Sequence, residues 1–76
     1  MDPLVVEAGE ADVDELLDVL ESGRRVRLRT EFLGSDHEVT LRYDGTWYCD
    51  TPTRLHRHDS REEMRHCLEE QGYARE

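Results

Sequence analysis

The chain contains no lysine, and no apolar run in its 76 residues is longer than Leu4-Val5-Val6. A membrane-spanning helix needs about 20 apolar residues and the core of a signal peptide about 7 to 15, so the sequence predicts neither. Aromatic residues make up only 7% of the chain and hydrophobic residues 36%. A core must therefore come from a few well-placed positions. We expect one cytoplasmic domain over residues 1–76.

Acidic residues outnumber basic ones, with 19 Asp and Glu against ten arginines and a formal net charge of -9. In composition the chain resembles the small, acidic, uncharacterised proteins of halophilic archaea, which implies an environment of concentrated salt and assigns no functional residue. In dilute buffer the excess carboxylates repel one another, whereas at molar salt the screening length falls to about 3 Å. The acidic balance also disfavours nucleic acid and anionic membranes as partners.

Residues 12–22 have the apolar spacing of an amphipathic helix, with one face made of Val13, Leu16, Leu17 and Leu20. Asp12 and Glu15 are spaced as a capping box, and Gly23 is a typical C-terminal stop. The remaining acids of this segment are predicted to form a solvated outer face, which consists of Asp14, Asp18 and Glu21.

A second helix is predicted to begin after Ser60, because Ser60 and Glu63 repeat the capping-box spacing. Gly72 ends it, and Tyr73 is placed to pack back on its last turn. The inward face is predicted to consist of Met64, Cys67, Leu68 and Gln71.

Between the helices the period of the pattern changes to two, which indicates half-buried strands. The inward residues of the first strand are predicted to be Val26, Leu28, Thr30 and Phe32. Gly34-Ser35 has the glycine-first order of a two-residue type II′ turn, and this turn pairs Leu28 with Leu41.

The third strand, residues 46–50, has two candidate registers. A tight two-residue loop turns Trp47 and Cys49 outward, whereas a three-residue loop with Gly45 in a bulge keeps both inward and pairs Leu41 with Trp47. We prefer the bulge because it buries the indole. Residues 51–59 are predicted to be a connecting loop anchored by Leu55, and Leu4-Val5-Val6 a short edge strand.

The predicted fold is α+β in the order α-β-β-β-α, a three-stranded antiparallel meander with both helices packed on one face. This order resembles that of the double-stranded RNA-binding domain. That family grips phosphates with a lysine-rich segment at the start of its second helix, whereas this chain has Ser60-Arg61-Glu62-Glu63 there. The resemblance is therefore one of topology, and it implies no RNA-binding residue in this chain.

The positive charge gathers on the outward side of the predicted sheet. The residues of this arginine face are Arg25, Arg27, Arg29, Arg42 and Tyr48. The predicted registers place Arg42 beside Arg27 and Tyr48 next to Arg29. We expect a non-enzymatic interaction module that uses this face or an edge strand to bind a protein partner or a second copy of itself. The alternative ligands are an anion or single-stranded nucleic acid, because guanidinium groups bind phosphates and carboxylates and aromatic rings stack on bases. A third interpretation is that the arginines only balance nearby acids and stay solvated.

The residue types that bind zinc occur at Cys49, His56, His58 and Cys67. Their spacing matches no familiar motif, since the chain has no C-x-x-C or H-x-x-x-H pair. We interpret the cysteines as small core residues and the histidines as loop residues, and we predict no metal and no cofactor. A small zinc-binding domain is the alternative. No nucleophile elbow or phosphate-binding glycine loop is present, so no enzyme is predicted.

Overall fold

A computed structural model describes residues 2–75 of the chain. It contains two helices and five strands, in the order β1 (Leu4–Glu7), α1 (Val13–Glu21), β2 (Val26–Phe32), β3 (Ser35–Tyr43), β4 (Trp47–Asp50), β5 (Leu55–His58) and α2 (Arg61–Glu70). The predicted α+β class is confirmed. The predicted three-stranded meander is wrong, because a strand is added at each edge.

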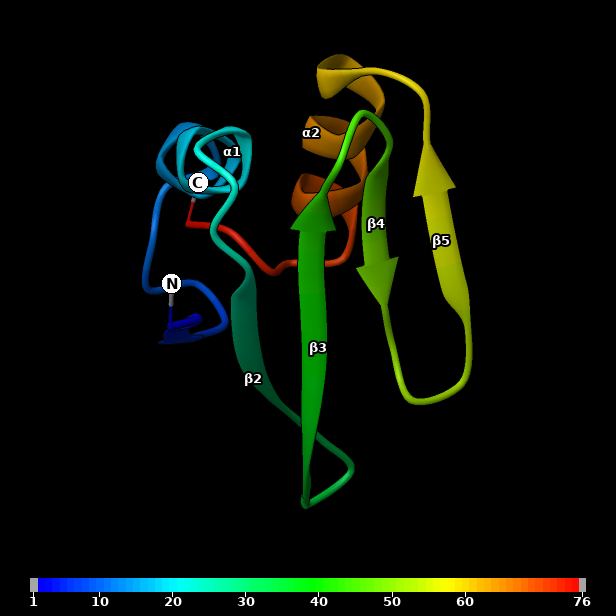
Figure 1. Ribbon diagram of the computed structural model, residues 1–76. Coiled ribbons are helices and arrows are strands. Elements are labelled where there is room, and N and C mark those ends of the chain that lie inside the picture. Colours follow the sequence, from blue (N-terminus) through cyan, green and yellow to red (C-terminus); the bar gives the residue numbers. More distant parts are fainter. Residues whose placement is uncertain (1, 76) are drawn as a thin grey trace.

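The five strands lie in the order β1-β2-β3-β4-β5, with β1 parallel to β2 and the other neighbours antiparallel. Both helices cover the same face of the sheet, α1 over β2 and β3 and α2 over β4 and β5 (Figure 1). The other face is left open. The added strands are β1, which was predicted as a short edge strand, and β5, which was predicted as a loop.

The core lies between the helices and the covered face of the sheet, where alternate strand residues point inward. Trp47 belongs to it, and the ring centroids of Trp47 and Tyr43 are 4.3 Å apart. Two predicted inward residues are instead exposed, Leu55 and Gln71. The prediction for Phe32 concerns a side chain outside the described part of the structure. The fully buried side chains include Leu16, Leu17, Leu20, Val26, Leu28, Val39, Leu41, Cys49, Met64 and Leu68.

The hairpin between β2 and β3 turns at Leu33-Gly34, and Leu28 pairs with Val39. Both turn residues have positive φ, 54° and 78°, as a type I′ turn requires, and this turn matches the twist of the strands. The predicted Gly34-Ser35 turn therefore lies one residue too far along the chain, and the predicted register is wrong by two residues. Because side chains alternate with a period of two, the inward and outward faces are unchanged.

The hairpin between β3 and β4 has a loop of residues 44–46 and pairs Tyr43 with Trp47 and Leu41 with Cys49. The predicted pairing of Leu41 with Trp47 is again wrong by two residues. The predicted orientation is confirmed, since Trp47 is 4% exposed and Cys49 is fully buried.

Both helices end at the predicted glycines, Gly23 and Gly72, which have φ of 94° and 74°. The predicted cap of α2 is confirmed, since the Glu63 N–H donates to Ser60 Oγ over 3.2 Å. The predicted cap of α1 is wrong. Asp12 occupies the N-cap position, but its carboxylate makes no capping hydrogen bond to the helix. The carboxylate instead accepts a 2.9 Å hydrogen bond from Arg75 Nε, near the other end of the chain.

The acids of α1 are not merely solvated, because two arginines of α2 bind them. Arg61 lies 2.9 Å from Asp18 and also pairs with Glu21. Arg65 pairs with Asp14. The inward faces of the helices are thus joined by the core and their outer faces by ion pairs.

Candidate metal centre

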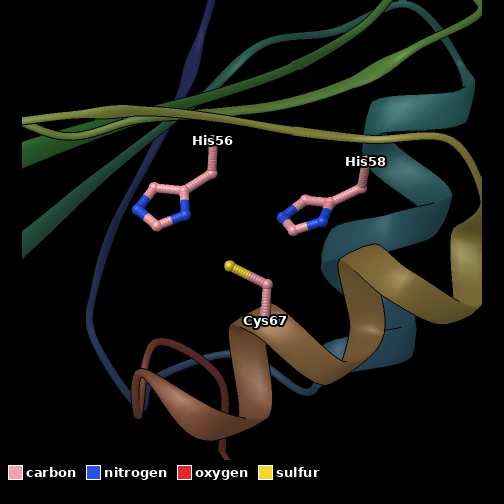
Figure 2. Close-up of side chains that lie close together, drawn as sticks. All are labelled: His56, His58 and Cys67. Carbon is pink, nitrogen blue, oxygen red and sulfur yellow. The ribbon is translucent and has the colours of Figure 1, made fainter.

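Strand β5 places two histidines on the covered side of the sheet. His56 and His58 are half-buried and alternate with the exposed Leu55 and Arg57. The two imidazoles project from β5 toward α2 (Figure 2). The prediction that these histidines lie in a loop is wrong, because pairing with β4 fixes their orientation.

Helix α2 supplies a thiol between the two imidazoles. Cys67 is 7% exposed, and its Sγ points from α2 toward the space between the rings (Figure 2). One ligand atom from each of His56, His58 and Cys67 forms a group whose members all lie within 4.8 Å of one another. Residues from a strand and a helix therefore meet in the pattern of a metal site, which the sequence spacing did not indicate.

Cys49 lies on the neighbouring strand β4, where it pairs with His56. Both cysteines are free thiols. A hydrogen bond from the Cys49 thiol is the main cause that lowers the pKa of Cys67 to about 6, and the imidazoles of His58 and His56 add to this effect while burial opposes it. The same hydrogen bond, together with burial, raises the pKa of Cys49. The arrangement therefore favours the thiolate form of Cys67 and the neutral form of Cys49.

His58 carries a buried nitrogen whose hydrogen-bonding capacity is unused. Its Nε2 has no hydrogen-bond partner within the described part of the chain. A buried imidazole nitrogen normally has a partner, because desolvation without a hydrogen bond is costly. A metal ion coordinated by this nitrogen would satisfy it.

The three candidate ligands line one side of a hollow of about 540 Å³. Its other walls carry carboxylates and a further imidazole from α2, including Glu62, Glu70 and His66. His66 Nε2 lies 3.3 Å from Glu70 Oε2 and is largely exposed. An ion held by the three ligands would face this acidic hollow, so a cation has an open approach from solvent.

The predicted arginine face lies on the open side of the sheet, but its residues form two separate rows across the strands. Arg27 pairs with Thr40 in the ladder and its guanidinium lies 2.7 Å from Glu38, which also faces Arg29. The predicted proximity of Arg42 to Arg27 is wrong, because the register is shifted.

The second row on the open face places an aromatic residue, Tyr48, between Arg42 and Arg57. The Arg42 guanidinium lies over the Tyr48 ring, 4.1 Å from its centroid. Tyr48 therefore faces Arg42 rather than Arg29, and on its other side it pairs with Arg57 of β5. Arg25 is exposed just before β2. Sequence reasoning missed Arg57 because its segment was predicted to be a loop.

None of the helices in the described residues has the length and apolar character needed to cross a membrane.

The chain was compared with protein-family models, with curated proteins and with solved structures. No curated protein and no solved structure is significantly similar to the chain. One family model matches it over residues 1–76, and by this match the chain belongs to DUF8001, a family of unknown function.

Proposed function

We propose that the protein binds a zinc ion through His56, His58 and Cys67. The observation that carries the proposal is the mutual approach of their three ligand atoms within 4.8 Å. Zn–N bonds of about 2.0–2.1 Å and a Zn–S bond of about 2.3 Å would bring the ligand atoms to roughly 3.5 Å from one another. The ligand atoms would therefore move closer together by roughly 1 Å when the ion binds.

The character of the donors supports zinc. Two imidazoles and one thiolate are borderline and soft ligands, which suit zinc better than magnesium or calcium. Cys49 does not belong to the group of three and is held neutral, so we assign it the role of a hydrogen-bond donor to the Cys67 sulfur. Hydrogen bonds to ligand atoms orient them and tune the metal. The fourth position then faces the acidic hollow, where water or a small ligand completes the tetrahedron.

Titration with Co²⁺ followed by displacement with Zn²⁺ tests this function. We expect one equivalent to bind and a sulfur-to-cobalt charge-transfer band to appear in the near ultraviolet, because a thiolate is one of the ligands. Cys67→Ser is expected to abolish the band. It should also weaken zinc binding by at least about 100-fold, since loss of an outer-shell partner alone costs about 10- to 100-fold.

The matched control is His66→Gln, one residue away on α2 and on the wall of the same hollow. It should bind both ions as the wild type does. The proposal is wrong if the band survives in Cys67→Ser, or if His66→Gln loses zinc as completely as His58→Gln.

We propose as a second candidate function that the open sheet face binds a protein partner or a second copy of the chain. The favouring observation is that both helices lie on the other side of the sheet (Figure 1). In the row of Arg42, Tyr48 and Arg57, the Arg42 guanidinium stacks on the Tyr48 ring and Arg57 pairs with Tyr48 in the sheet. Arginine and tyrosine are enriched at protein interfaces.

The triple variant Arg27→Gln, Arg29→Gln, Arg42→Gln tests this face. Folding should survive, since exposed ion pairs contribute only about 0 to 1 kcal/mol each. We expect self-association in sedimentation, or retention of a partner from the native extract, to be lost. Binding of single-stranded oligonucleotides that disappears in the variant would instead indicate a nucleic-acid role. Identical behaviour of variant and wild type in all three assays would rule the face out.

A further inference from the structure

A second hollow of about 410 Å³ lies on the same side of the sheet as the two helices. Its walls come from β2, β3 and β5, from the β4–β5 loop (residues 51–54) and from the residues after α2. The β2–β3 hairpin extends past the ends of both helices, so this part of the sheet is not covered by them (Figure 1). His56 lines this hollow as well as the acidic one, which places the hollow beside the candidate metal centre. Its volume is within the range of about 300–1,000 Å³ found for small-molecule sites.

The charge of this hollow is opposite to that of the chain. One residue in four of the sequence is acidic, with 19 Asp and Glu in 76 residues, yet among the residues that the structure describes no acid lines the hollow. The lining instead includes Arg54, His37 and His56. A ligand with negative charge is therefore favoured here, whereas the acidic hollow on the other side of His56 favours a cation.

The loop that carries Arg54 is held in one conformation by its own hydrogen bonds. Thr51 Oγ1 accepts from the Arg54 N–H over 3.0 Å and donates to the Arg54 carbonyl over 2.7 Å. Within the described part of the chain, the Arg54 guanidinium has no ion-pair partner. The unengaged guanidinium is available to a ligand, and because the backbone is already fixed, binding has to order only the Arg54 side chain.

The remaining walls indicate what kind of anion fits. Pro52 and the half-buried Tyr73 present apolar surface, and Thr30 and Thr53 present hydroxyl groups. A guanidinium binds a carboxylate or a phosphate through two parallel hydrogen bonds, but a bare phosphate would leave the apolar walls without a contact. An anion with a short hydrocarbon part satisfies both kinds of wall.

We propose that this hollow binds a small organic carboxylate, with Arg54 holding the carboxylate and Pro52 and Tyr73 contacting the hydrocarbon part. The inference goes beyond the proposed zinc function and does not depend on it, because these three residues are not candidate ligands of the metal.

Titration of ¹⁵N-labelled protein with butyrate, followed by NMR, tests this site, first in zinc-free protein and then with one equivalent of zinc. We expect saturable shifts in the amides of residues 51–54 and of Tyr73 in both. Arg54→Gln should weaken binding by at least about tenfold, because it removes a charge-assisted bidentate contact. The matched control is Arg57→Gln, which removes the same charge three residues later on the open face of the sheet and should bind butyrate as the wild type does.

Three outcomes would overturn the site. Shifts that never saturate would mean that no pocket is filled. An equal loss of affinity in Arg57→Gln and Arg54→Gln would mean that only net charge attracts the anion. Inorganic phosphate binding as tightly as butyrate would mean that the apolar walls take no part. A failure of zinc to bind leaves the butyrate result unaffected, so the two proposals fail separately.

Discussion

Zinc is expected to raise the midpoint of thermal unfolding of this protein by about 10–20 °C. At a free zinc concentration 100 times the dissociation constant, binding to the folded state stabilises it by about 2.7 kcal/mol. In a domain of this size each kcal/mol raises the midpoint by about 4–8 °C. The structural reason is that β5 is an edge strand with no fully buried residue, and the ion would join it to α2.

Circular dichroism melts with and without zinc measure this effect, and a chelator should reverse it. Cys67→Ser should show little or no increase with zinc, while His66→Gln should keep the increase. If Cys67→Ser gained as much as the wild type, zinc would be acting through exposed carboxylates and imidazoles rather than through the proposed centre.

Replacement of Trp47 by alanine is expected to destabilise the fold by about 3–5 kcal/mol, the usual loss for a large buried aromatic side chain. A chain of 76 residues has a total stability of only about 4–11 kcal/mol, so a large part of it would be lost. Trp47 is 4% exposed and packs against the ring of Tyr43. Urea unfolding followed by circular dichroism gives the difference in the free energy of unfolding.

The control for this variant is the next residue. Tyr48 lies on the open face, where the Arg42 guanidinium lies over its ring, and an exposed cation–π contact is worth about 0.5–1 kcal/mol. Tyr48→Ala should therefore cost far less than Trp47→Ala. Equal losses would mean that β4 has slipped by one residue relative to the register described here.

The sequence predicted which face of each helix and strand is buried better than it predicted which residues pair. Both hairpin registers were wrong by two residues, an error that leaves every side chain on its predicted side. In the first hairpin the cause is Leu33, which adopts φ of 54° although a left-handed conformation is unfavourable for leucine. Local turn preferences placed the glycine first, whereas the pairing of the strands selected a type I′ turn.

The sequence favoured the candidate metal centre only as an alternative, for a related reason. A strand is recognised by apolar residues at alternate positions, and β5 has histidines at the inward positions where a packed strand has apolar ones. Functional sites are where local sequence rules are expected to fail. The four residues of zinc-binding type could be named from the sequence, but the approach of a strand to a helix separated by a turn could not be derived from their spacing.

The bond between Asp12 and Arg75 affects how the chain can fold. These residues are 63 positions apart, and the Arg75 N–H also donates to the Ala11 carbonyl over 2.7 Å. The hydrogen bonds that Asp12 and Ala11 accept at the start of α1 therefore cannot form until residue 75 has been synthesised. Contacts that span so long a loop form late, because the entropy of closing it must be overcome first. During synthesis α1 would emerge early, but the contacts of its N-terminus with Arg75 would be among the last to form.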